Sequence, residues 1–126
     1  MSRAELPDDV QGLVGDHMPT MDHVAILLDL RSNPGTPHAV VDVAARTRVD
    51  PSASERVLRE LTASRIVSRQ GDLYQYAPAA DMRGAVDSLA EMYHTKPVTL
   101  VKAIYDRPAR AAQSFANAFR IRKAGP

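Results

Sequence analysis

One stretch of this chain, residues 50–77, constrains its fold most strongly, because it predicts a helix followed at once by a tight two-stranded hairpin. Asp50 can cap the helix, and Pro51 suits the first turn, where its missing N–H costs nothing. Two β-prone runs lie on either side of Gly71, which can take the positive φ that a hairpin turn needs. The sequence therefore predicts a helix–hairpin unit.

The predicted helix, at about residues 51–63, has two different sides. At 100° per residue, Val57, Leu58 and Leu61 share one side, which identifies it as the buried face. Serine and arginine side chains share the opposite side, and they are Ser52, Arg56 and Arg59. The hairpin, at about residues 66–77, follows after only a few residues, so we expect the two elements to form one unit.

This arrangement resembles the recognition helix and wing of bacterial winged-helix transcriptional regulators, broadly of the MarR and ArsR kind. The pattern is V-L-x-x-L, then I-V-x-R, then G, then Y-x-Y, and its residues are Val57, Leu58, Leu61, Ile66, Val67, Arg69, Gly71, Tyr74 and Tyr76. Such families often carry a glycine just before the I-V pair, where this sequence has Arg65. We therefore expect the helix to end without the steric freedom of glycine.

The resemblance covers about residues 20–78 and implies a mainly α fold with a small β-hairpin wing. Such a winged helix-turn-helix domain binds double-stranded DNA and regulates transcription. The exposed face of its recognition helix enters the major groove, where arginine can contact guanine, and a basic wing lies near the phosphate backbone. The residues that the resemblance assigns to DNA are Ser52, Arg56, Arg59, Arg69, Gln70, Arg46 and Arg48.

Alternatives remain open for these arginines. Glu55 precedes Arg59 by four residues, which allows an exposed helix pair. Arg56 and Glu60 have the same spacing, and each such pair is worth about 0.2–0.5 kcal/mol. Residues 31–95 carry eight basic and eight acidic side chains, a balance that also suits a winged helix that binds a protein partner. The alternative function is therefore a protein–protein interaction module that does not bind DNA.

Three segments are predicted along the chain. Residues 1–19 form an N-terminal arm that packs on another element. Residues 20–78 form the winged-helix domain, whose first helix has two apolar sides and is therefore expected to be sandwiched. Thr36 and Pro37 predict the start of the second helix of this domain. Residues 79–126 form a C-terminal helical extension.

The C-terminal extension is predicted to contain three helices, at about residues 82–93, 98–105 and 109–121. The second is apolar nearly all round, which predicts that it is buried. Added helices of this kind can join two subunits, as the two half-sites of a palindrome require, or can complete the core of one subunit. The residues assigned to a homodimer interface are Ile26, Leu30, Val86, Leu89, Tyr93, Phe115 and Phe119.

Charge differs between the two ends of the chain. Residues 1–30 carry one arginine against six acidic side chains, whereas residues 96–126 carry seven basic side chains against Asp106. The ends could attract each other within a subunit or across a dimer, or the basic end could face a polyanion. A simply solvated surface is the remaining interpretation.

Several classes of function are not indicated. The chain has no cysteine, which excludes disulfides, thiolate metal sites and cysteine nucleophiles. Its four histidines lack the spacing of a metal site, and no glycine-rich phosphate loop is present, so we expect no enzyme, metal or cofactor. No apolar run approaches the ~20 residues of a membrane span. A secretory signal is also absent from the first residues, so the expected location is the cytoplasm.

Overall fold

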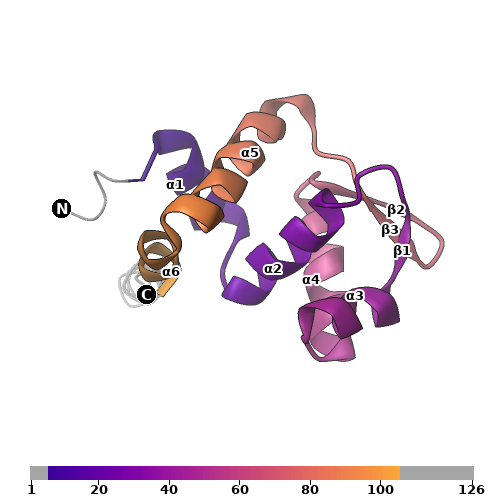
Figure 1. Cartoon of the computed structure of the whole chain (residues 1–126). Coiled ribbons are helices and arrows are strands. Elements are labelled where there is room, and N and C mark those ends of the chain that lie inside the picture. Colours follow the sequence, from indigo (N-terminus) through magenta and orange to yellow (C-terminus); the bar gives the residue numbers. More distant parts are fainter. Residues whose placement is uncertain (1–5, 106–126) are drawn as a thin grey trace, which may run out of the picture.

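The computed structural model describes residues 6–105, which form six helices and three short strands (Figure 1). The helices are α1 (Asp8–His17), α2 (Met21–Arg31), α3 (Val40–Thr47), α4 (Pro51–Ala63), α5 (Ala80–Thr95) and α6 (Pro97–Tyr105). The strands are β1 (His38–Ala39), β2 (Val67–Gln70) and β3 (Leu73–Tyr76). A mainly helical fold with a small antiparallel hairpin, as the sequence predicts, is confirmed.

The three strands form one antiparallel sheet in the order β1-β3-β2. A two-residue turn joins β2 to β3, since Gln70 pairs with Leu73. Gly71 opens this turn with a φ of 62°, in the left-handed region that glycine adopts without strain. β1 adds a third strand through the pairing of His38 with Tyr74, and the sequence pattern does not predict this strand.

The strand β1 shows that the prediction of a helix starting at Thr36 and Pro37 is wrong. Both residues precede β1, and α3 begins only at Val40, with Ala39 as the residue before its first turn. Ala39 has an extended backbone, with φ −80° and ψ 151°, which lets it pair with β3 before the chain turns into the helix. Strand pairing therefore outweighs the local preference of threonine and proline for a helix start.

Both ends of α4 are held by hydrogen bonds. At the start, the carboxylate of Asp50 accepts from the N–H of Ser52 at 3.0 Å and from the next N–H at 3.2 Å, as the sequence predicts. At the end, Arg65 takes a φ of 66°, and the N–H of Ile66 donates to the carbonyl of Leu61 over 3.1 Å. This is the left-handed helix termination that glycine usually makes, and here an arginine makes it.

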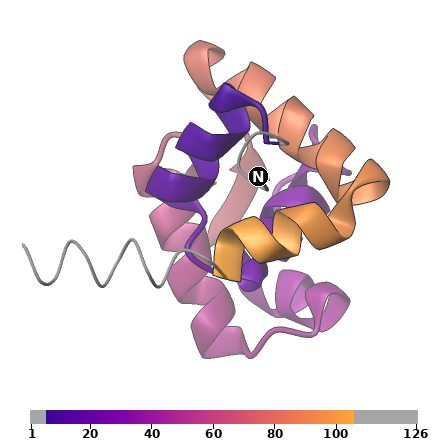
Figure 2. The ribbon, with the colours of Figure 1, turned by 90° about the vertical axis from the view of Figure 1, so that its left-hand side faces the viewer.

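The core is built around α2, which is apolar and buried on two sides (Figure 1). One side of α2 packs against α3, α4 and β3. The other side is turned toward α1, α5 and α6, which contact one another and lie together in the view of Figure 2. The prediction that the first helix of the domain is sandwiched is therefore confirmed.

The second cover of α2 comes from the same chain, which corrects the assignment of Ile26 and Leu30 to a dimer interface. Both side chains are fully buried, as are Val86 and Leu89 on α5. For these four residues the structure supports the alternative in which the extension completes the core of one subunit. Tyr93 differs from them, because it is 40% exposed. The two remaining residues of the set, Phe115 and Phe119, lie outside the described residues.

The helix α6 also differs from its prediction as a helix buried nearly all round. Leu100 and Ile104 face the core, but Val98 and Tyr105 are 66% and 67% exposed. The reason is that α6 packs mainly against α5 and α1, which cover only one of its sides. The prediction is therefore wrong for the opposite side.

The predicted N-terminal arm contains α1, which packs against α5 and α6. Its apolar residues join the common core, so the arm is an integral part of the fold. A hydrogen bond of 2.8 Å between Nδ1 of His17 and Oγ of Ser64 also connects α1 to the C-terminal end of α4. The arm therefore helps to fix the position of α4.

Candidate nucleic-acid interface

The helix α4 packs against α2, α3 and β2 (Figure 1). Its inner face is fixed in the core, because Val57, Leu58 and Leu61 are fully buried, as their spacing predicts. Ser54 is also buried and donates a hydrogen bond of 3.2 Å to the carbonyl of Val49. The side chains of α4 that are predicted to contact DNA and are exposed are Ser52, Arg56 and Arg59.

Of the two ion pairs that the sequence allows along α4, only one forms. Arg59 donates to the carboxylate of Glu55 over 3.2 Å, in an exposed pair. Glu60 does not pair with Arg56, because its carboxylate lies 2.6 Å from Nε2 of His23 on α2. Arg56 has no ion-pair partner within residues 6–105, and it is exposed.

His23 on α2 contacts a carboxylate of α4, and the sequence does not identify this contact. The side chain of His23 is buried and only 2% exposed. Its other ring nitrogen, Nδ1, lies 2.8 Å from Oγ1 of Thr20, the residue that caps α2. With both nitrogens engaged, the ring is held between the start of α2 and the side of α4. The position of His23 on a helix with two apolar sides indicates that the ring is buried. It does not indicate the partner, because Glu60 lies 37 residues away in the sequence.

The hairpin carries Arg69 and Gln70, both exposed. The guanidinium of Arg69 lies over the ring of Tyr74, 5.6 Å from its centroid, and donates to the carbonyl of Gly71 over 2.8 Å. These contacts hold the arginine along the hairpin, next to the turn. Asp72, in the same turn, is exposed as well, so the tip of the hairpin carries both signs of charge.

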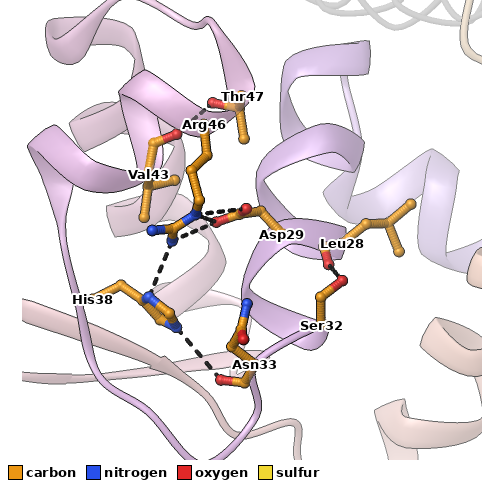
Figure 3. A network of polar contacts seen from close by, with 8 residues as sticks. All are labelled: Leu28, Asp29, Ser32, Asn33, His38, Val43, Arg46 and Thr47. Atoms are coloured by element: carbon orange, nitrogen blue, oxygen red, sulfur yellow. Dashed lines mark hydrogen bonds and ion pairs between the residues drawn. The ribbon is translucent and has the colours of Figure 1, made fainter.

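Arg46 is exposed, but its guanidinium already has partners within the chain (Figure 3). Its guanidinium forms a two-pronged ion pair with Asp29 on α2, with contacts between 2.8 and 3.2 Å. It also donates to Nδ1 of His38 over 3.0 Å, and Nε2 of His38 lies 3.4 Å from the carbonyl of Asn33. The hydrogen bonds to Asp29 raise the pKa of Arg46.

The geometry at His38 follows from the chemistry of arginine. A guanidinium has donors only, so Nδ1 of His38 must accept and the ring proton sits on Nε2. Arg46 therefore links α3 to α2 and, through His38, to β1 (Figure 3). Contact of Arg46 with DNA stays a prediction, and in such a contact DNA would compete with these partners for the guanidinium.

Arg48, the last residue assigned to DNA, lies in the turn between α3 and α4. It is exposed and takes a φ of 60°, the left-handed conformation that non-glycine residues seldom adopt. Within residues 6–105 it has no ion-pair partner. Its guanidinium is therefore free beside the start of α4.

An open groove of about 370 Å³ lies where α2, α3 and α5 meet. Both of its arginines are engaged, Arg46 with Asp29 and Arg31 with Asp87 at 3.0 Å. Tyr93 forms part of its wall. The charges of these two arginines are thus compensated within the chain, unlike the charge of Arg56 on α4.

Among residues 6–105, no cluster of three or more histidine, cysteine, aspartate or glutamate side chains could hold a metal ion. None of the helices in this range is long and apolar enough to cross a membrane. Comparisons of the chain with family models, with curated proteins and with solved structures found no match.

Proposed function

We propose that this protein is a DNA-binding transcriptional regulator of the cytoplasm and that residues 20–78 are a winged helix. The order of the elements supports this fold: a helix, a short strand, two helices and a hairpin, with the sheet order β1-β3-β2. In such a fold α4 is the recognition helix and the β2–β3 hairpin is the wing. The mechanism is steric or recruiting control at a promoter.

The observation that carries the proposal is the free guanidinium of Arg56. An arginine that already had a carboxylate partner would have to give it up to bind a base or a phosphate. On α4 the obvious partner, Glu60, is held by His23 instead. Arg56 is therefore available for the two-pronged contact that a guanidinium makes with guanine in the major groove.

The other residues of the proposed interface surround Arg56. Ser52 lies in the first turn of α4, where its exposed hydroxyl can bind a phosphate. Arg59 can bind DNA at the cost of a weak exposed pair with Glu55. The predicted set is Ser52, Arg56, Arg59, Arg48, Arg69, Gln70 and Arg46, of which Arg46 is already held in an ion pair with Asp29.

A titration with DNA tests this function. Fluorescence anisotropy with a random-sequence duplex, repeated from low to physiological salt, should show binding that weakens steeply as salt rises, with dissociation constants of about 10⁻⁴–10⁻⁶ M. In Arg56→Ala with Arg59→Ala, binding should weaken, and the log–log salt slope should fall by about 0.9 for each of the two arginines that contacts a phosphate. Circular dichroism of the variant checks that it is folded. Absence of binding at low salt would exclude the proposal.

A protein-interaction module is the second candidate, and specific observations favour it. Asp50, Glu55 and Asp72 are exposed or half-buried around the same surface and would repel a polyanion. Val41 at the start of α3 is 65% exposed and Leu73 in the hairpin is 39% exposed, as suits an apolar contact. Capture of a protein partner with an affinity that salt hardly changes, together with no affinity for DNA, would favour this candidate.

The homodimer stays a prediction. Two copies on a palindromic site would double the contacts with DNA. Because Ile26, Leu30, Val86 and Leu89 are buried within one chain, a dimer would have to use other residues. Sedimentation of the protein with and without a duplex measures the number of copies.

A further inference from the structure

One side of α6 combines apolar and basic side chains that are exposed. Val98 and Tyr105 are 66% and 67% exposed. Lys102 is also exposed, and Val101 is half-buried. These four residues, which we name the α6 face, share one side of the helix at 100° per residue, and the buried Leu100 lies on the other side. An exposed apolar patch of this kind marks a contact surface.

The exposed side of α1 is acidic. Asp8, Asp9 and Asp16 are exposed, and at 100° per residue they lie on the same side of the helix as Gly12. We name these four residues the α1 face. Gly12 is exposed as well, and no atom lies within 4 Å of the position that a Cβ would occupy there. A bulky side chain of another molecule can therefore approach the backbone of α1 between carboxylates.

The α1 face and the α6 face belong to neighbouring helices. Within one chain α1 packs against α6, and both helices lie toward the viewer in Figure 2. Within residues 6–105 no ion pair joins α1 to α6, and Asp8, Asp16 and Lys102 have no ion-pair partner. Charges of opposite sign thus lie near each other on one end of the molecule without being paired inside it.

We infer that a second copy of this chain docks on this end, with the α6 face of each copy against the α1 face of the other. A two-fold symmetric contact needs a surface that is complementary to itself. Here Lys102 of one copy lies beside the carboxylates of the other, and Tyr105 or Val98 lies over the uncovered backbone at Gly12. Each copy supplies both halves of the contact, so it forms twice in the dimer.

The other two-fold arrangements are less favourable. Contact between two α6 faces would bring Lys102 against Lys102, and contact between two α1 faces would bring three aspartates against three. Like charges placed opposite each other weaken association. A stable interface also buries roughly 800 Å² on each partner. A fully covered aromatic side chain contributes only about 150–250 Å², so the α6 face needs the second helix face to approach that area.

This inference gives the predicted homodimer an interface outside the core, where four of the residues first assigned to it are buried. It goes beyond the proposed function and does not depend on it, because DNA takes no part in the contact or in its test. A chain that fails to bind DNA can still form this dimer.

Reversal of charge tests the interface in sedimentation velocity of the full chain. Lys102→Glu places an acid against the acidic α1 face, and Asp8→Lys with Asp16→Lys places lysines against Lys102. Each variant should raise the dissociation constant of the dimer at least about tenfold. The matched control is Arg48→Glu, the same reversal at an exposed arginine in the turn between α3 and α4. This control should leave the dissociation constant unchanged.

An equimolar mixture of the two charge variants gives the sharpest result. In the mixed dimer one α1–α6 contact carries both reversed charges and the other carries the wild-type charges, so both contacts are again between opposite charges. The mixture should therefore dimerise as the wild type does, although each variant alone does not. An attraction within one chain could not be restored by mixing. A mixture that stays monomeric would overturn the inference.

Tyr105→Ser tests the apolar part of the contact. A buried tyrosine at the centre of an interface is commonly among its most important residues, so this variant should also raise the dissociation constant at least about tenfold. Circular dichroism checks that each variant is folded. A wild-type chain that stays monomeric up to about 10⁻⁴ M would overturn the inference, and so would a dimer that tolerates all of these substitutions.

Discussion

Two neighbouring helices of this protein each carry an exposed arginine, Arg46 on α3 and Arg56 on α4, but only Arg46 is paired with a carboxylate. Where α2 meets α3, Arg46 is bound to Asp29 and to His38 (Figure 3). On the exposed face of α4, Arg56 has no ion-pair partner within residues 6–105, because His23 holds Glu60. The helix α2 determines both outcomes, since it supplies the carboxylate to the first arginine and the histidine that withdraws a carboxylate from the second.

This difference shows that an arginine on the expected DNA side of a fold is weak evidence for an interface. Arg46 and Arg56 lie ten residues apart on neighbouring helices, and the sequence assigns both to DNA. The partners that separate their roles lie on α2, far away in sequence. The free arginine is the better candidate because no internal pair has to be broken before it binds.

The largest expected effect is on stability. Arg46→Ala removes the two-pronged pair with Asp29 and the hydrogen bond to His38, and charged hydrogen bonds of this kind contribute about 1.5–3 kcal/mol when buried. Because the Arg46 side chain is 41% exposed, we expect a loss of about 1–2 kcal/mol in urea unfolding. Arg56→Ala should change stability by less than about 0.5 kcal/mol. Equal losses in the two variants would remove the distinction between the surfaces.

A smaller effect is expected at the two left-handed arginines that flank α4. Arg48→Gly and Arg65→Gly should each stabilise the protein by about 1 kcal/mol, since glycine takes this conformation without strain. Arg65→Ala, which keeps the Cβ, should give no such gain. Only Arg48→Gly should also weaken DNA binding, because Arg65 lies at the far end of α4. Weaker binding in both variants would show that general charge, and not this surface, governs affinity.

The next effect concerns the carboxylate that His23 holds. Glu60→Gln keeps a side-chain oxygen that can accept from His23 but removes a negative charge close to Arg56. Exposed charge pairs contribute about 0.2–1 kcal/mol, so DNA affinity should rise by about twofold to fivefold. Glu91→Gln on α5 is the matched control, because Glu91 is exposed and carries the same charge. The same gain in affinity in both variants would show that the total charge of the protein, and not the position of Glu60 beside Arg56, determines the affinity.

The smallest effect is a dependence on alkaline pH. Burial raises the pKa of the Tyr76 hydroxyl above its ordinary value of 10.0, and the charge of Asp87 acts in the same direction. The folded state therefore keeps this proton more tightly than the unfolded state, so stability should fall as pH rises above about 10. Tyr76→Phe should lose less stability than the wild type between about pH 8 and pH 10.5 in urea unfolding. Equal losses would show that other groups cause the decrease.

The parts of the fold that the sequence predicts depend on local patterns. The cap at Asp50, the buried stripe of α4 and the turn at Gly71 each follow from residues within a few positions of one another. The sandwiched helix α2 follows from its two apolar sides, although the sequence cannot tell whether a second subunit or the same chain covers it.

The parts that the sequence does not predict depend on distant partners. β1 exists because His38 pairs with Tyr74, and Arg46 is neutralised by Asp29, 17 residues earlier. Glu60 could pair with Arg56 by its spacing, and only the fold brings His23 close enough to compete. The spacing of residues along a helix shows which ion pairs are possible, and the tertiary structure determines which of them form.

The most direct test of the account compares two single arginines in a DNA titration over a range of salt concentrations. Arg56→Ala and Arg83→Ala each remove one exposed arginine that has no ion-pair partner within residues 6–105, one from α4 and one from α5. We predict that Arg56→Ala lowers the log–log salt slope by about 0.9, as for one lost phosphate contact, or weakens binding about tenfold if Arg56 contacts a guanine. Arg83→Ala should leave the binding curve unchanged. Identical curves for the two variants would contradict the claim that the exposed face of α4 binds DNA.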